Sequence, residues 1–291
     1  MLQSLETALL DVLNEVQGTD IHLIIGGGYG LNLRIKNRQE SGERTLYDVW
    51  PEERSTGDID LFLRPELLID SNRLKPLSEA LSKLNYEVVP GAEKYQFAKS
   101  GSGDPEIEII KIDILTGPED CFRDTSVRID DRRARPNPSV GIHAHPTNEA
   151  LTLEEELFPM MIEGELSDGE PFKAIVYLPH AFTFLMMKLF AYKDRYEDED
   201  KEYGRYHALD MYSILATTTE TEWDQAIKLR NRHMHNPYVL EAGRIISEHF
   251  AAINHMGIIR LRESKYFRPE MNLEHFIRDL KELFPFEAKT P

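Results

Sequence analysis

Two aspartates separated by a single residue give the sequence its strongest chemical signal. Asp58 and Asp60 lie in the run Asp-Ile-Asp-Leu-Phe-Leu, which predicts a β-strand over residues 58–63. Alternate residues of a strand face the same side, so the two carboxylates project together while Ile59 faces the core. Two like charges this close repel each other unless a cation lies between them. Mg²⁺ suits such a place because it prefers carboxylate oxygens together with substrate phosphates.

A third carboxylate stands in another strand-like run. Asp113 lies among apolar residues in the stretch 107–115, where an unpaired carboxylate would be costly to bury. Three carboxylates from two neighbouring strands suit a two-metal site, in which ions about 3.5–4 Å apart stabilise the attacking and leaving oxygens of a phosphoryl displacement. The alternative is that Asp58 and Asp60 only solvate an edge strand, since Asp-x-Asp pairs also occur in glycosyltransferases and calcium loops.

A glycine-rich turn precedes the acidic strand. Gly-Gly-Gly-Tyr-Gly at residues 26–30 follows a short apolar strand at residues 21–25 and precedes a helix predicted over residues 31–38. Free N–H groups and the helix dipole at such a turn attract phosphate. The spacing fits neither the dinucleotide-binding pattern nor the P-loop, because the third glycine and the Gly-Lys-Ser/Thr sequence are both missing. Arg34 and Arg38, one helical turn apart, would add positive charge for a nucleotide triphosphate, whereas a tight strand-to-helix turn is the structural alternative.

Together these features resemble the DNA polymerase β-like nucleotidyltransferase superfamily. Its pattern is a glycine turn after a strand, a hydrophobic-Asp-hydrophobic-Asp strand and a later third carboxylate. The residues that fall on it, within about residues 20–116, are Gly26, Gly27, Asp58, Asp60 and Asp113. The resemblance implies Mg²⁺ or Mn²⁺ bound by the three aspartates. Two departures are a longer gap between turn and acids, with residues 39–54 as the insertion, and Gly27 where the family more often has Ser.

Two stretches are similar to one branch of that superfamily, the AbiEii-type toxin nucleotidyltransferases of abortive-infection and related toxin–antitoxin pairs. The first stretch consists of the glycine turn, the helix with its arginines, and the sequence Arg-Ser-Thr-Gly-Asp-Ile-Asp at residues 54–60. The second consists of Lys-Leu-Phe-Ala at residues 188–191 and a later Leu-Asp at residues 209–210. The nucleotide-binding residues implied by this similarity are Gly26, Gly27, Arg34, Thr56 and Lys188. The implied catalytic residues are Asp58, Asp60, Asp113 and Asp210, the last as a base or a positioning group. His207 stands where the branch often has Asp.

Lys188 and Asp210 can each also be explained by a purely structural role. Lys188 is equally typical of a lysine whose charge reaches solvent from a helix rim. Asp210 precedes an apolar helical stretch and could cap it.

The resemblance implies transfer of a nucleoside monophosphate from an NTP to an acceptor hydroxyl, with release of pyrophosphate. The branch implies tRNA as the acceptor, growth arrest as the role and a cognate antitoxin as a protein partner. A small-molecule transferase of the antibiotic-modifying kind would use the same residues and would suit an acidic surface better. A nucleotide-binding protein without turnover and a pure interaction protein are the remaining alternatives.

The elements that must position these residues follow from hydrophobic periodicity. Helices are predicted over residues 2–16 and 73–84, and loops over the aperiodic residues 39–56, which we expect to be mobile, and 130–138. Further strands are predicted at residues 86–89, 95–99, 107–115, 160–165 and 172–177. A glycine-rich turn at residues 100–105 would join two of them.

Helical periodicity dominates from residue 179 onward. We therefore expect an α/β (α+β) nucleotidyltransferase domain with a mixed sheet at residues 1–178 and a helical domain at residues 179–291. His143 and His145 could form a metal pair, but no further ligands accompany them at suitable spacing, which favours an ordinary loop.

Composition limits the function classes. The 291 residues are 41% hydrophobic and 29% charged, as in ordinary globular proteins. The 34 basic and 51 acidic residues give a net charge of −17, which argues against nonspecific binding to DNA or anionic membranes. Cys121 is the single cysteine and allows no intramolecular disulfide. Without an apolar run of about 18 residues or a signal peptide, the sequence predicts a cytoplasmic protein.

Overall fold

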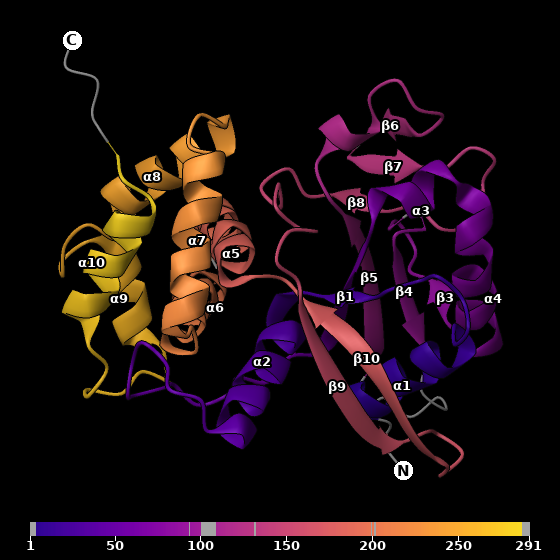
Figure 1. The fold of residues 1–291 in the computed structure, drawn as a ribbon, viewed down its shortest axis with the longest axis horizontal. Coiled ribbons are helices and arrows are strands. Elements are labelled where there is room, and N and C mark those ends of the chain that lie inside the picture. Colours follow the sequence, from indigo (N-terminus) through magenta and orange to yellow (C-terminus); the bar gives the residue numbers. More distant parts are fainter. Residues whose placement is uncertain are drawn as a thin grey trace. The chain divides into compact units, whose positions relative to one another are not determined.

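The computed structural model describes residues 4–92, 94–99, 109–130, 132–198, 200 and 202–286. The chain divides into two compact units, one made of Met1–Gly30 and Ser55–Pro179, the other of Leu31–Arg54 and His180–Pro291 (Figure 1). The predicted domain boundary after residue 178 lies next to the change of unit at Pro179. Residues 31–54, which we expected in the first domain, group with the helical residues instead. The glycine-rich turn predicted at residues 100–105 falls outside the described residues.

A mixed β-sheet forms the centre of the first unit. Its strands run in the order β3-β4-β5-β2-β1-β10-β9, and β8 pairs with β5 off this path. The strands are β1 (Ile24–Ile25), β2 (Asp58–Leu63), β3 (Glu87–Val88), β4 (Gln96–Lys99), β5 (Ile110–Thr116), β8 (His145–Pro146), β9 (Phe158–Glu165) and β10 (Pro171–Leu178). The β2–β5, β1–β10 and β5–β8 pairs are parallel, and the other pairs are antiparallel.

The helices of this unit begin at recognisable signals. In α1 (Leu5–Glu15) the Ser4 hydroxyl accepts a hydrogen bond from the Thr7 N–H, an N-cap that satisfies one free donor of the first turn. Pro65 occupies the first position of α3 (Pro65–Ile69), where its missing N–H costs nothing. The remaining short elements are η1 (Ser71–Leu74), α4 (Lys75–Lys83) and η2 (Glu119–Phe122).

A small hairpin corrects one sequence prediction. Residues 130–138 were expected to form a loop, but β6 (Arg128–Asp130) pairs antiparallel with β7 (Arg133–Arg135). Each strand has only three residues, too few for an alternating pattern to be recognised in so charged a stretch. Figure 1 shows the hairpin at the upper edge of the first unit.

The second unit is helical. Its helices are α5 (Ala181–Arg195), α6 (Glu202–Ala216), α7 (Glu220–Arg232), α8 (Pro237–His249), α9 (Met256–Glu263) and α10 (Leu273–Leu283). Helix α2 (Gly27–Ser41) begins in the first unit and continues into the second. The prediction of a mixed sheet followed by a C-terminal helical region is therefore confirmed. Among the described helices, none combines the length and the apolar character needed to cross a membrane.

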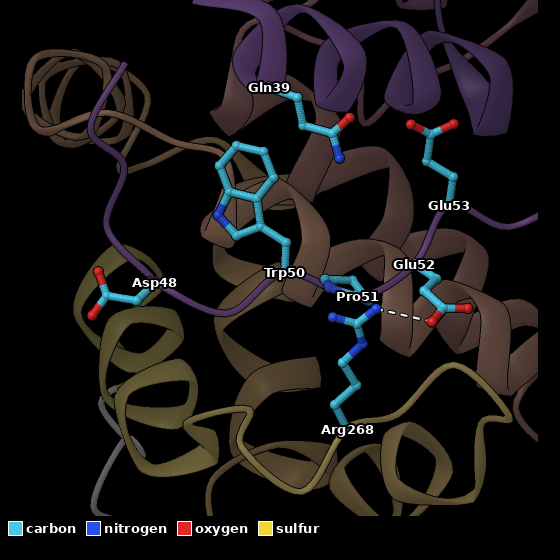
Figure 2. A pocket seen from close by; sticks show the side chains of 7 residues that line it. All are labelled: Gln39, Asp48, Trp50, Pro51, Glu52, Glu53 and Arg268. Carbon is cyan, nitrogen blue, oxygen red and sulfur yellow. Dashed lines mark hydrogen bonds and ion pairs between the residues drawn. The ribbon is translucent and has the colours of Figure 1, made fainter. Parts of the chain in front are cut away.

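As expected, the segment between residues 42 and 57 contains no helix or strand. Hydrogen bonds to other residues of the second unit nevertheless hold its first part in place. The Leu46 N–H donates to the Thr218 carbonyl at 2.8 Å, and the Tyr47 hydroxyl donates to Asp279 at 2.9 Å. The indole of Trp50 folds back onto the Tyr47 carbonyl. This segment lines an open pocket of about 440 Å³ together with Gln39 of α2 and Arg268. Figure 2 shows the side chains that line it.

Candidate active site

The sheet of the first unit brings the three predicted aspartates together. In the parallel pairing of β2 with β5, Asp60 lies opposite Asp113, and Asp58 lies opposite Lys111. Asp58 and Asp60 share one face by alternation, and residues in register on adjacent strands project to the same side. All three carboxylates therefore lie on one face of the sheet, with the Lys111 ammonium on the same face.

Asp113 has a partner that the sequence did not reveal. Gln96 lies opposite it on β4, and its Nε2 donates to Asp113 Oδ1 at 2.7 Å. Burial raises the pKa of Asp113 above its usual range, the bond from Gln96 offsets part of that rise, and the negative charge of Asp58 adds to it. Asp113 is therefore a stronger base than an exposed aspartate. The turn predicted at residues 100–105 would join the strands 95–99 and 107–115, but the sequence does not give the register that places Gln96 opposite Asp113.

We expect Asp113→Asn to stabilise the protein at about pH 7, by roughly 0.5–2 kcal/mol. The folded state raises the pKa of this carboxyl, so stability is lost as the pH rises from the unfolded value of about 3.9 through the raised folded value, and the full cost applies above it. Asparagine keeps an acceptor for Gln96 but has no charge. The gain should vanish below about pH 3.9, where the wild-type carboxyl is protonated in both states.

Urea unfolding at both pH values measures this difference. Asp224→Asn, an exposed aspartate on α7, controls for the loss of one negative charge from an acidic protein. An equal gain in both variants would show that net charge alone is responsible.

The glycine turn packs directly against the acidic strand. The Gly26 N–H donates to the Asp60 carbonyl at 2.9 Å. Gly27 has a φ of +60°, and a Cβ built on it would lie 1.5 Å from Oδ2 of Asp60. Only glycine leaves room for the carboxylate here and adopts this backbone without strain. The Gly26 N–H, which we expected to be free for phosphate, is engaged by the strand.

Gly27→Ala should therefore destabilise the protein by about 1–3 kcal/mol more than Gly18→Ala. Gly18 is a matched control because it also has a positive φ, +80°, but has no atom within 4 Å of the added Cβ. Gly18→Ala costs only the backbone strain, whereas Gly27→Ala must also displace Asp60. Urea unfolding of both variants measures the difference, and equal losses would contradict the close approach.

Lys188 and Asp210 form a buried cluster within the second unit. Lys188 Nζ lies 2.7 Å from Asp210 Oδ2, and Arg54 Nε and Nη2 donate to the two carboxylate oxygens at 2.8 and 2.9 Å. Burial alone would raise the pKa of Asp210, but the charges of Lys188 and Arg54 outweigh it and lower the pKa well below its usual range. Asp210 is therefore ionised at neutral pH and is a weaker proton acceptor than an ordinary aspartate in this arrangement. Arg54 was visible in the sequence only as part of a motif, because its partner lies 156 positions away.

His207 lies in the same cluster. Burial lowers its pKa to about 3, and the positive charge of Lys188 contributes further, so the imidazole is neutral. Among the described residues, neither of its ring nitrogens has a hydrogen-bond partner.

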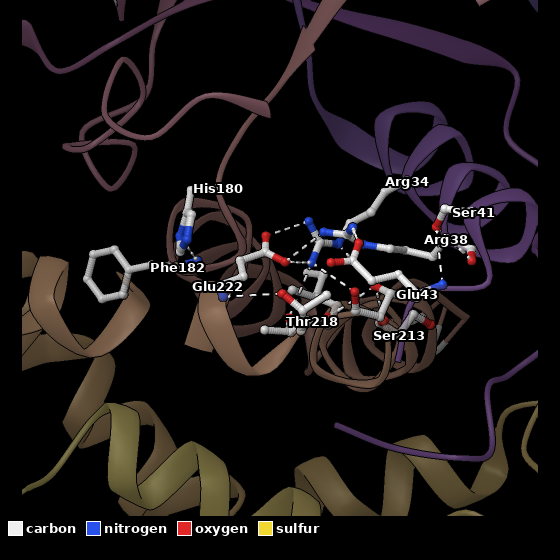
Figure 3. A network of polar contacts seen from close by, with 12 residues as sticks. Arg34, Arg38, Ser41, Glu43, His180, Phe182, Ser213, Thr218 and Glu222 are labelled. Carbon is white, nitrogen blue, oxygen red and sulfur yellow. Dashed lines mark hydrogen bonds and ion pairs between the residues drawn. The ribbon is translucent and has the colours of Figure 1, made fainter. Parts of the chain in front are cut away.

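Arg34 belongs to a different network in the second unit (Figure 3). Its side chain is 1% exposed, and Nη1 and Nη2 donate to the two Glu222 oxygens at 2.7 and 2.6 Å. Its Nε donates to the Thr217 hydroxyl at 3.0 Å. This is the bidentate geometry of a buried structural pair. The predicted contact of Arg34 with nucleotide phosphates stays a prediction.

The predicted site residues are thus distributed over three groups. The first unit contains the glycine turn and the three aspartates, with half-buried Thr56 two residues before β2. In the second unit Lys188 and Asp210 lie together, and Arg34 lies in the network around Glu222.

The donor set of the first unit has the chemistry that Mg²⁺ requires. Within the described part of the chain, no three His, Cys, Asp or Glu side chains converge as the ligands of one metal ion. Mg²⁺ in nucleotide-using sites is held by one or two carboxylates plus phosphate oxygens and waters, so a protein-only cage is not needed. Asp58 and Asp60 supply such carboxylates, and the missing side chain of Gly27 leaves room for the Asp60 carboxylate beside the turn.

Comparison with known proteins finds little. No family model matches the chain, and no curated protein matches it. Among solved structures, the solution structure of the antibiotic-resistance factor ANT(2'')-Ia is similar, with 16% sequence identity over 81% of this chain and 100% of that chain. The TM-score is 0.33, a likeness too low to assign a fold family or a function.

Proposed function

We propose that the protein is a metal-dependent nucleotidyltransferase that transfers a nucleoside monophosphate from an NTP to an acceptor hydroxyl and releases pyrophosphate. The observation that supports this most is the register of β2 and β5, which places Asp60 opposite Asp113 with Asp58 on the same face. The close approach of Gly27 to Asp60 gives a second, independent reason to group the turn with the acids.

In this proposal Asp58 and Asp60 bind the metal together with the phosphates of the nucleotide. The metal, Mg²⁺ or Mn²⁺, would neutralise charge on the phosphoryl group being transferred. The helix α2 starts at Gly27, so the free N–H groups of its first turn lie at the Asp60 end of the site and can contact phosphate.

Asp113 fits the role of general base. The acceptor oxygen bonds to the α-phosphorus, the bond from that phosphorus to the pyrophosphate oxygen breaks, and the hydroxyl proton moves to the Asp113 carboxylate. A raised pKa favours this transfer because catalytic bases work best when their pKa lies near the working pH. Gln96 is a positioning residue, since its bond to Oδ1 fixes the orientation of the carboxyl group.

In this proposal the remaining predicted residues have the roles that the family resemblance implies. Thr56 in the first unit and Arg34 and Lys188 in the second would contact the nucleotide, and Asp210 would act near the reacting atoms. Lys188 and Arg54 both contact the Asp210 carboxylate, and side chains with these charges suit the binding of a polyphosphate. Asp210 itself is better placed to position these cations than to accept a proton, because its pKa is lowered.

For the acceptor we propose tRNA, with a role as the toxin of a toxin–antitoxin pair and an antitoxin as partner. A small-molecule acceptor is the second candidate, because a net charge of −17 opposes the approach of a polyanion such as tRNA.

The test incubates the protein with Mg²⁺, each α-labelled NTP, total tRNA and a panel of hydroxylated small molecules. Label in tRNA supports the first candidate, and label in a small molecule supports the second. If NTP binds but neither acceptor is labelled, the protein is a nucleotide-binding protein without transferase activity, and the proposal fails.

A further inference from the structure

The β6–β7 hairpin concentrates positive charge in an otherwise acidic protein. Residues 128–135 read Arg-Ile-Asp-Asp-Arg-Arg-Ala-Arg, while the whole chain has a net charge of −17. In the antiparallel register Arg128 lies directly opposite Arg135. Like charges at opposed positions of a hairpin destabilise it unless another group compensates them.

A cavity of about 370 Å³ opens beside these arginines within the first unit. The polar side chains that line it include those of Lys94, Arg128, Asp130, Arg135, Ser139 and His143. Its volume lies within the range of small-ligand sites, about 300–1,000 Å³, and it offers three cations, a hydroxyl and an imidazole against one carboxylate.

The Asp130 carboxylate, which lines the cavity, already lies near two arginines. Asp130 Oδ1 lies 2.7 Å from Arg135 Nε and 3.7 Å from Arg133 Nη2. Among the described residues, Lys94 and Arg128 have no ion-pair partner. The lining therefore has net positive charge at the place where Arg128 and Arg135 face each other.

The pKa of His143 depends on this positive charge. Its backbone N–H donates to the Lys94 carbonyl at 2.9 Å, which joins two walls of the cavity. Burial, followed by the charges of Arg135, Lys94 and Arg133, lowers its pKa to about 4, and Asp130 only partly opposes them. The imidazole is thus neutral and can donate or accept a hydrogen bond, and an anion placed in the cavity would raise this pKa.

We propose that this cavity is a second anion site, which binds a phosphate group through Lys94, Arg128 and Arg135. The phosphate comes either from a nucleic-acid backbone or from a phosphorylated small molecule. The site is distinct from the carboxylates of the proposed active centre, although Lys94 lies only two residues before Gln96. It does not depend on the proposed transferase activity.

The experiment titrates the full-length protein with inorganic phosphate and follows the His143 imidazole by NMR. We expect saturable binding that raises the His143 pKa by about one unit or more. Arg128→Gln should weaken phosphate binding by about tenfold, and Arg128→Lys should restore most of it. Arg73→Gln, which removes an arginine paired with Asp20 elsewhere in the first unit, is the control and should bind as the wild type does.

Two further arms distinguish the sources of phosphate. If a single-stranded RNA occupies the site, Arg128→Gln should reduce the salt dependence of RNA binding by about one charge. If a phosphorylated nucleoside occupies it instead, that ligand should raise the His143 pKa while RNA leaves it unchanged.

The proposal is overturned if inorganic phosphate, RNA and the phosphorylated nucleoside all leave the His143 pKa unchanged, or if Arg128→Gln binds them as the wild type does. Because Arg128 is exposed and opposes another arginine, Arg128→Gln should unfold no earlier than the wild type in urea. These outcomes are independent of the transfer assay, so failure of one proposal does not imply failure of the other.

Discussion

Asp60→Asn is expected to lower the rate of nucleotidyl transfer by about 10³-fold while the protein remains folded. The substitution replaces a charged ligand by a neutral one of the same shape, and metal stabilisation of the transferred phosphoryl group contributes several kcal/mol, at about 1.4 kcal/mol for each tenfold in rate. The transfer rate should fall more when Asp60 is replaced than when Asp58 is replaced, because Asp60 lies between Gly27 and Asp113. The measurement is kcat at saturating Mg²⁺ and NTP for whichever acceptor is labelled.

The control for this variant is Asp20→Asn. Asp20 is an exposed aspartate of the first unit whose ion-pair partner within the described part of the chain is half-exposed Arg73, so its loss should change kcat by less than about twofold. Urea unfolding of Asp60→Asn checks that the fold persists. A kcat within tenfold of the wild type would show that Asp60 does not bind the catalytic metal, even if the protein proves to be a transferase.

The strands that position the acids could be predicted from sequence because their alternation is unambiguous. Residues 58–63 form β2 as predicted, and the pair predicted at residues 160–165 and 172–177 corresponds to β9 and β10. The register of β2 against β5 could not be predicted. Alternation shows which residues share a face of a strand but not which strand lies beside it, so the opposition of Asp60 and Asp113 required the structure.

The partners of charged side chains were the least predictable part. Arg34 looked like a phosphate ligand because a glycine turn precedes it, whereas its carboxylate partner Glu222 lies 188 positions later. Arg54 and Asp210 are similarly distant in sequence. Helical periodicity shows that α2 and α7 exist but does not show which of their polar residues turn inward, and a buried ion pair leaves no local pattern.

Glu222→Ala should destabilise the protein by about 3–5 kcal/mol, the usual cost of removing one partner of a buried ion pair. Arg34 is 1% exposed and would be left without a counter-charge, and Arg38 Nη2, 3.2 Å from Glu222 Oε2, would lose the same partner. The matched control is Glu220→Ala, two residues earlier on the same helix, where the side chain is exposed and the loss should be below about 0.5 kcal/mol.

The contribution of Glu222 to the free energy of unfolding should also fall as the pH is lowered. Burial alone would raise its pKa, but the charge and hydrogen bonds of Arg34 outweigh burial and lower the pKa to about 2. Because the folded value lies below the unfolded value of about 4.3, the stabilisation is complete above that pH and is lost as the pH falls toward about 2. The difference in unfolding free energy between wild type and Glu222→Ala, measured in urea, should therefore shrink across this window.

A double variant decides between loss of an ion pair and loss of packing. In Arg34→Met with Glu222→Leu, both charges of this pair are replaced by apolar groups of similar length, so no uncompensated Arg34 charge remains, and Arg38 keeps its ion pair with Glu43. Stability should therefore recover by several kcal/mol relative to Glu222→Ala. If the double variant is no more stable than Glu222→Ala, the shape of the buried site rather than the unpaired Arg34 charge is responsible. Recovery of stability would show that Arg34 is buried for structural reasons, and a transfer assay on the same variant would then test directly whether its charge is also needed to bind nucleotide.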